Sequence, residues 1–168
     1  YGEAAPGEQG HKRVDGPPVS WVAQRLGDGA SFACTLTPPQ PLSDIFLGHL
    51  ELTREHFAAA LSLAEARERW ARFQRPDDLL TVIQPGTARL YSYLAGEQAE
   101  YLLLKAVNIK EITGRSLDEL PSVPGSGGLA GQSLGRATKR LDIAISLVRQ
   151  LNALANGRPI DAALVAGS

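Results

Sequence analysis

The sequence contains no methionine and only one cysteine among its 168 residues. The single cysteine, Cys34, cannot form a disulfide within the chain, and it cannot supply the several thiolates of a cysteine-based zinc or iron–sulfur site. Because the chain begins with Tyr1 and lacks methionine, we expect a processed or truncated chain, which is compatible with an exported or organellar protein. The compartment itself stays open.

Charge of one sign and long apolar runs are also scarce. The formal net charge is -1, with 43% hydrophobic and 21% charged residues, which is typical of one globular domain over residues 1–168. This balance excludes a strongly basic nucleic-acid binder, so we expect no nucleic-acid partner. The strongly apolar runs, such as the one near Tyr101 to Leu104, are far shorter than the roughly 20 residues that cross a bilayer. No transmembrane segment is predicted.

Catalytic and metal-binding motifs are missing as well. The sequence has neither a Gly-x-Ser-x-Gly nucleophile elbow nor a His-Glu-x-x-His zinc motif. His49 and His56 lie seven residues apart without a Glu-x-x-His pattern, so we expect no metal site, no cofactor and no catalytic residue there. Cys34 is interpreted as a packed structural residue. An enzyme is therefore disfavoured, although the sequence leaves this question open.

The beginning of the chain is predicted to be an arm followed by a hairpin. Residues 1–18 are rich in glycine, proline and charge, which indicates a mobile arm. Residues 19–37 are predicted to form a β-hairpin around a two-residue turn at Asp28-Gly29, with Gly27 paired to Ala30. This register gives one mainly apolar face: Trp21, Ala23, Phe32, Cys34 and Leu36.

Residues 42–114 are predicted to form a helical core. A first helix begins after the N-cap Ser43 and continues to about Gln74. A second helix runs from about Asp78 to Lys110, with a break or kink at Pro85-Gly86. The apolar residues of the first helix recur every three or four positions: Phe46, Leu50, Thr53, Phe57, Leu61 and Ala64.

The end of the chain is predicted to be a linker followed by a helix. Residues 116–133 are rich in proline and glycine, and residues 134–156 form an amphipathic helix. The apolar residues of that helix have heptad spacing, which is typical of a helix that packs on another helix, in this chain or in a second copy. They are Leu134, Ala137, Leu141, Ala144, Val148, Leu151 and Ala155.

One stretch resembles a known family. Residues 75–84 read Arg-Pro-Asp-Asp-Leu-Leu-Thr-Val-Ile-Gln, and a helical segment with Tyr91 and Tyr93 follows. This arrangement resembles the phasins over about residues 44–110. The resemblance implies a helical, non-enzymatic protein that coats polyhydroxyalkanoate granules. The predicted hairpin, Pro85-Gly86 and the segment 116–133 depart from the phasin pattern.

Together these features predict a mainly α fold, a three- to four-helix bundle-like domain with one N-terminal β-hairpin. The leading functional hypothesis is a non-enzymatic interaction or assembly protein that uses the helix 134–156 and the hairpin edge. Its partner would be another protein or a second copy of the chain. The candidate interaction residues are Leu134, Leu141, Val148 and Leu151.

Two alternatives stay open at this point. One is a phasin-like amphipathic coat on a hydrophobic surface. The other is a helical bundle that binds a small molecule, as an enzyme or a carrier, to which His49 or His56 could also contribute. The candidate pocket residues are Tyr91, Tyr93, Glu97 and Glu100.

Overall fold

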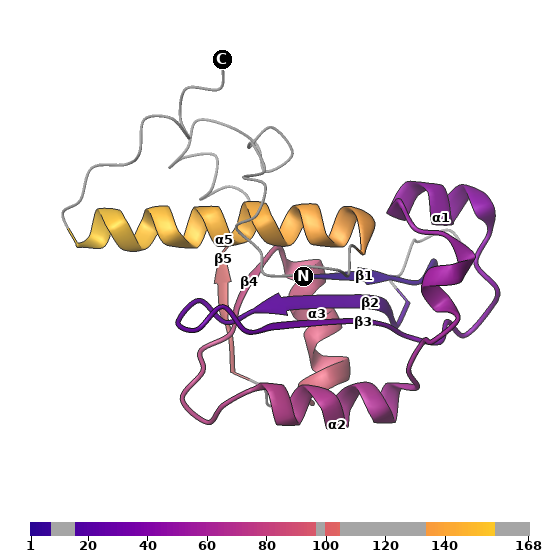
Figure 1. Cartoon of the computed structure of the whole chain (residues 1–168), viewed down its shortest axis with the longest axis horizontal. Coiled ribbons are helices and arrows are strands. Elements are labelled where there is room, and N and C mark those ends of the chain that lie inside the picture. The colour runs from indigo at the N-terminus through magenta and orange to yellow at the C-terminus, as the bar shows by residue number, and fades with distance from the viewer. Residues whose placement is uncertain (8–15, 97–99, 105–133, 157–168) are drawn as a thin grey trace, which may run out of the picture.

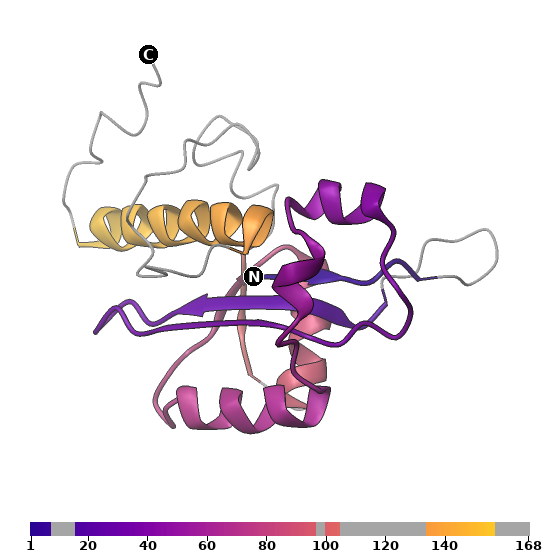
Figure 2. The same cartoon turned by 45° about the vertical axis from the view of Figure 1, so that its right-hand side comes forward.

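The computed structural model describes residues 1–7, 16–96, 100–104 and 134–156 (Figure 1). Within these residues the fold is mixed: helices cover both faces of a three-stranded antiparallel sheet, and a two-stranded parallel sheet lies beside them (Figures 1 and 2). The expectation of a mainly α, bundle-like domain is therefore wrong.

The described elements begin with three strands, continue with three helices, and end with strands and helices in alternation. In order they are β1 (Gly2–Ala4), β2 (Pro18–Gln24), β3 (Ser31–Thr35), α1 (Asp44–Leu50), the 3₁₀ helix η1 (Arg54–Phe57), α2 (Leu63–Phe73), β4 (Thr81–Ile83), α3 (Pro85–Ala95), β5 (Leu102–Leu104) and α5 (Gly135–Ala155).

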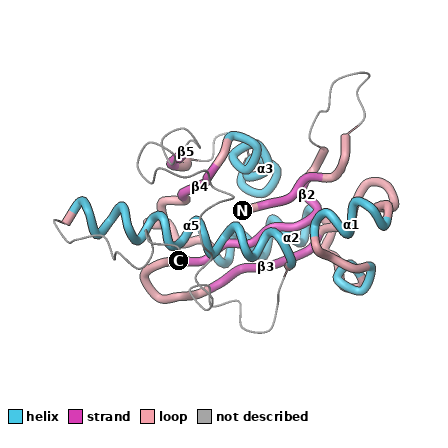
Figure 3. Tube along the Cα trace, turned by 90° about the horizontal axis from the view of Figure 1, so that it is seen from above, coloured by secondary structure: helices cyan, strands magenta, loops and turns pink. Residues whose placement is uncertain are grey.

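The middle strand of the antiparallel sheet, β2, is buried on both faces. The adjacent residues Trp21 and Val22 of this strand point to opposite sides of the sheet, and neither side chain has exposed surface. Trp21 packs with residues of α2 and α3, whereas Val22 packs with residues of α1 and α5. Figure 3, which views the molecule from above, shows α5 lying over the sheet. A strand of this kind needs helices on both sides, which a bundle with an attached hairpin does not provide.

Aromatic side chains dominate the layer between the sheet and α2 and α3. The Trp21 ring lies 5.9 Å from the Trp70 ring in an edge arrangement and 5.9 Å from the Tyr91 ring in a stacked one. Phe32 meets Trp70 edge-on at 5.3 Å. Such pairs add stabilisation beyond the burial of their area, so this layer fixes α2 and α3 on the sheet.

The β2–β3 hairpin forms with a different register from the predicted one. Arg25, rather than Gly27, lies opposite Ala30, and its amide donates to the Ala30 carbonyl at 2.8 Å. The two-residue turn is therefore wrong, and the loop contains four residues. The loop is held by Asp28, whose carboxylate accepts from the Ala30 amide at 3.0 Å, and by Gly29 at a φ of 74°. Because the register moves by two residues, the predicted apolar face is preserved.

The first residues of the chain belong to the sheet. Residues 2–4, which lie within the expected mobile arm, form β1 and pair antiparallel with β2. Gly2 lies so close to Trp21 that a Cβ added there would be 2.5 Å from the indole ring. The glycine therefore lets β1 approach the central tryptophan. Residues 8–15 of the expected arm lie outside the described residues.

The first predicted long helix is wrong, because the chain forms three shorter helices instead. Ser43 caps α1 as expected, and its hydroxyl accepts from the Phe46 amide at 3.2 Å. The helix ends at Glu51, which has a left-handed backbone with a φ of 57°. A new helix, α2, begins after Ser62, which forms a capping box with Glu65. The Ser-x-x-Glu spacing was present in the sequence and marks this boundary.

The second predicted long helix is also wrong. Strand β4 occupies its start, and Pro85 is the first residue of α3, where proline needs no amide partner. After α3 the chain returns as β5 and pairs parallel with β4. The helix provides the crossover that two parallel strands require. The linker predicted over 116–133 lies outside the described residues.

The last helix agrees with the predicted range 134–156, but its apolar residues pack inside this chain. Leu134, Ala137 and Leu141 belong to a core cluster with Val22 and Leu50, and all five are buried. Further along α5, Ile143 and Leu147 pack with Ile83 of β4. The first half of the heptad pattern thus secures α5 to the sheet.

Leu134→Ala should lower the free energy of unfolding by about 2–5 kcal/mol, because it removes a buried side chain from the core beneath α5. Ile45→Ala, at a residue that is 89% exposed on α1, should change it by less than about 0.5 kcal/mol. Urea unfolding at several protein concentrations measures both. If Leu134 instead packed between two copies, the loss would depend on protein concentration.

Candidate binding cleft

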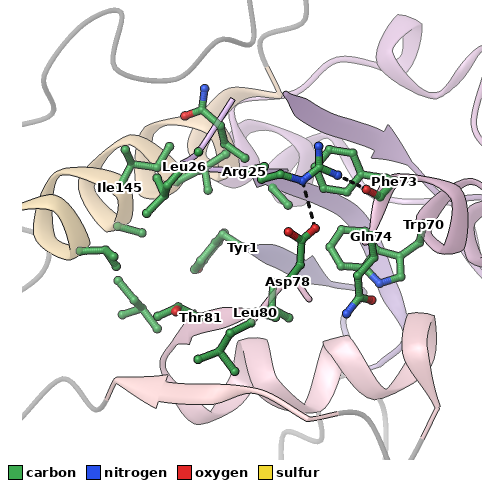
Figure 4. Close-up of a pocket in the computed structure, with 18 of the residues that line it drawn as sticks. Tyr1, Arg25, Leu26, Trp70, Phe73, Gln74, Asp78, Leu80, Thr81 and Ile145 are labelled. Atoms are coloured by element: carbon green, nitrogen blue, oxygen red, sulfur yellow. Dashed lines mark hydrogen bonds and ion pairs between the residues drawn. The ribbon is translucent and has the colours of Figure 1, made fainter. Parts of the chain in front are cut away.

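A cleft of about 280 Å³ opens where three parts of the chain meet (Figure 4). The first is the tip of the β2–β3 hairpin, the second is the segment from the end of α2 to β4, and the third is the middle of α5. In this cleft the hairpin and the C-terminal helix, both predicted from the sequence to make contacts, line the same hollow.

The walls of the cleft are mainly apolar. Trp70 and Phe73 of α2 lie toward one end, and Ile145 of α5 lies toward the other (Figure 4). The ring of Tyr1 lies between them. The remaining apolar lining comes from β4, the segment before it, and α5: Leu80, Ile83, Leu141, Ala144 and Val148. Such a surface suits an apolar group and leaves orientation to a few polar side chains.

One arginine organises the polar side of the cleft. The Nε of Arg25 donates to Asp78 at 3.0 Å, and its Nη1 donates to Asp28 at 3.0 Å. The guanidinium carbon lies 4.9 Å from the centre of the Phe73 ring, and Nη2 donates to the Phe73 carbonyl. Arg75 joins from the other side with an ion pair to Asp28 at 2.7 Å. These contacts fix the hairpin tip against the end of α2 and the segment after it, so two of the three parts that line the cleft are held together.

Both carboxylates of this network are favoured in the charged form. The pKa of Asp78 is lowered from its ordinary value, first by the hydrogen bond from the Arg75 amide and then by the Arg25 side chain. The pKa of Asp28 is lowered mainly by the hydrogen bond from the Ala30 amide. Arg25 therefore faces two ionised partners at neutral pH.

Asp78→Asn should destabilise the protein most at neutral pH. A carboxylate whose folded pKa lies below its ordinary value of 3.8 stabilises the fold above that pH, and the contribution is lost as the pH falls through the folded pKa. The difference between the melting temperatures of wild type and variant should therefore shrink below about pH 4. Asp77→Asn is the matched control, because Asp77 is exposed and is expected to leave the melting temperature unchanged at every pH. A difference that did not vary with pH would contradict the ion-pair explanation.

Two large apolar side chains remain exposed where they line the cleft. Leu26, in the hairpin loop, is 43% exposed, and Leu79, in the segment before β4, is 67% exposed. Leu26 lies in the hairpin turn, and Leu79 lies shortly after the turn at Pro76-Asp77 and directly before Leu80. Exposed apolar surface that continues into a cleft is typical of a binding site.

A second hollow, of about 420 Å³, adjoins the cleft. The two hollows share four lining residues. These are Gln74, Asp77, Asp78 and Leu79. The second hollow is completed by Pro76, Tyr91, Ala95 and Glu100.

The candidate pocket residues are only partly brought together. Tyr91 is 1% exposed and belongs to the aromatic core, where its hydroxyl donates to Gln74 Oε1 at 3.2 Å. Tyr91 and Glu100 both line the second hollow, although Glu100 is exposed. Tyr93 lies on the surface of α3 and lines neither hollow. Glu97 lies outside the described residues.

His49 and His56 line neither hollow. His56 accepts from the Thr53 amide at 3.0 Å and so caps η1, while His49 contacts Arg136 of α5. In the described ranges, no three histidine, cysteine, aspartate or glutamate side chains gather in a way that could hold a metal ion.

The four candidate interaction residues divide between core and cleft. Leu134 is in the core, Leu141 and Val148 line the cleft, and Leu151 packs on the cluster around Ile83. Sequence reasoning missed the two exposed leucines and the arginine of the cleft. Leu26 carried a signal, since it is an apolar residue within a turn, whereas Leu79 is followed by Leu80 and carried none. Asp78 lies 53 residues from Arg25, and no local pattern in the sequence links the two.

Cys34 is buried against the aromatic layer, and burial raises the pKa of its thiol to about 12. A thiolate is therefore scarce at physiological pH, which is consistent with a structural role.

Iodoacetamide should alkylate Cys34 slowly in the native protein and rapidly in denaturant at the same pH. At pH 8 the folded thiol should have a thiolate fraction about a thousandfold lower than an unperturbed one. Intact-mass spectrometry over time gives both rates. Equal rates in the two conditions would mean that the thiol is not buried.

No family model matches this sequence, and neither the curated proteins nor the solved structures contain a significant match. The resemblance to phasins therefore stays a prediction, which these comparisons neither support nor refute. None of the helices in the described residues combines the length and apolar character needed to span a membrane.

Proposed function

We propose that this chain is a non-enzymatic binding protein whose cleft takes apolar side chains of a protein partner. The observation that carries the proposal is the pair of exposed leucines, Leu26 and Leu79, beside an apolar cleft lined by α5 and the hairpin tip. The C-terminal helix and the hairpin, which the sequence predicted to make contacts with a partner, both line this cleft and would form one binding surface.

The charges of the cleft support binding rather than catalysis. Asp78 and Asp28 are committed to Arg25 and Arg75, so they serve the shape of the cleft instead of being poised for proton transfer. The lining that is left over is largely apolar, and apolar lining contributes affinity through the removal of surface from water.

A small apolar ligand is the second candidate, favoured by the volume of about 280 Å³. A molecule of that size inside the cleft would leave most of Leu79 in water. A protein segment that lies across the cleft covers the leucine as well, so it accounts for more of the exposed apolar surface.

The test is a selection of random peptides from a display library on the intact chain, followed by affinity measurements with purified peptides. Leu79→Ser should weaken binding of the selected peptides about tenfold. The substitution removes an exposed apolar side chain that the bound peptide would bury, and with it that side chain's contribution to the binding free energy. Ile45→Ser is the matched control, since Ile45 is also an exposed apolar residue but lies on α1 and lines neither hollow.

Equal affinities of wild type and the Leu79→Ser variant for the peptides would contradict the proposal that the peptides bind at the cleft. The small-ligand alternative replaces the proposal under a different result. In that result no peptide is selected, a small apolar dye binds the wild type, and the Val148→Trp variant, whose larger side chain fills the cleft, no longer binds the dye.

A further inference from the structure

We infer that the partner segment carries a basic side chain next to its apolar anchor, with the apolar group in the cleft and the cation in the adjoining hollow. This inference rests on the proposed function and names the chemistry of the occupant. It depends on the charge of the second hollow and on the way in which the two hollows join.

The charged side chains that line the second hollow are all acidic. They are Asp77, Asp78 and Glu100. Asp78 is engaged by Arg25, but Asp77 and Glu100 form no ion pair with any described residue. Two carboxylates around one hollow therefore remain available to a cation, and their negative charge disfavours an acidic partner.

Asp77 and Leu79 lie where the apolar cleft and the acidic second hollow join. Both residues line the apolar cleft and the acidic hollow. An apolar group seated against Leu79 thus lies beside Asp77, and the next few residues of the same segment reach toward Glu100. Because one extended residue spans about 3.3–3.6 Å, a cation close in sequence to the anchor meets this geometry.

The length of the combined surface favours a protein segment over a small cationic amphiphile. The surface continues from the hairpin loop at Leu26, past Leu79, to Glu100, which lies two residues before β5. A peptide covers this surface with alternating contacts, whereas a single-chain amine fills one hollow and leaves the leucines exposed.

The charge contribution should be modest and sensitive to salt. Exposed ion pairs are each worth about 0.2–1 kcal/mol, which corresponds to about 1.5- to 5-fold in affinity. Screening at high ionic strength should remove most of this factor.

The experiment uses the full chain and three synthetic peptides with the same leucine-rich core, flanked by lysine, glutamine or glutamate. Fluorescence anisotropy should rank their affinities as lysine, then glutamine, then glutamate, with about 1.5- to 5-fold per charged position at 50 mM salt and little difference at 500 mM salt. Asp77→Asn together with Glu100→Gln should abolish the ranking without abolishing binding. Glu68→Gln is the control, because Glu68 is an exposed acidic residue of α2 that lines neither hollow.

The outcomes separate this inference from the proposed function. Equal affinities for the three peptides, with loss of all three by Leu79→Ser, would overturn the inference and leave the proposed function standing. A lysine preference that survives Asp77→Asn and Glu100→Gln would also overturn it, because the attraction would come from elsewhere. If dodecylamine binds and the peptides do not, the occupant is a small amphiphile and both proposals are wrong.

Discussion

The burial of β2 on both faces is the constraint on which the rest of this structure depends. Trp21 and Val22 have no exposed surface and point to opposite sides, so one strand requires two separate apolar layers. Helices α2 and α3 supply the first layer and α1 and α5 supply the second. The position of α5 follows from this requirement, and the cleft forms where the middle of α5 passes the hairpin tip.

The cleft has fixed walls on one side and apolar surface that is exposed to solvent. Arg25 joins the hairpin to the end of α2 and the segment after it through the Asp78 carboxylate, the Phe73 carbonyl and the Phe73 ring. Arg75 reaches back to Asp28 in the hairpin loop, so these two lining segments are fixed relative to each other. The leucines beside the cleft keep much of their surface exposed, 43% for Leu26 and 67% for Leu79. A preformed surface of this kind loses little conformational entropy on binding. Little of the binding free energy that apolar contacts provide would therefore be spent on ordering the surface.

Local signals in the sequence predicted some elements well and others poorly. The N-cap Ser43, the apolar face of the hairpin and the range of the last helix follow from spacing and capping within a few residues. The long helices failed because their apolar spacing also fits short helices and strands, and the capping box at Ser62 was overlooked. The cleft could not be predicted, since Arg25 and Asp78 meet only through the tertiary fold.

The central claim is that a partner segment seats on the surface between the hairpin tip and α5. Backbone amide NMR of the full chain, titrated with the lysine-flanked leucine peptide, tests this claim most directly. The account predicts that the largest shift changes occur at Leu26, Leu79 and Val148, with those at Ile45 unchanged. Changes centred on α1 or on the exposed face of α3, with none at the cleft, would contradict it.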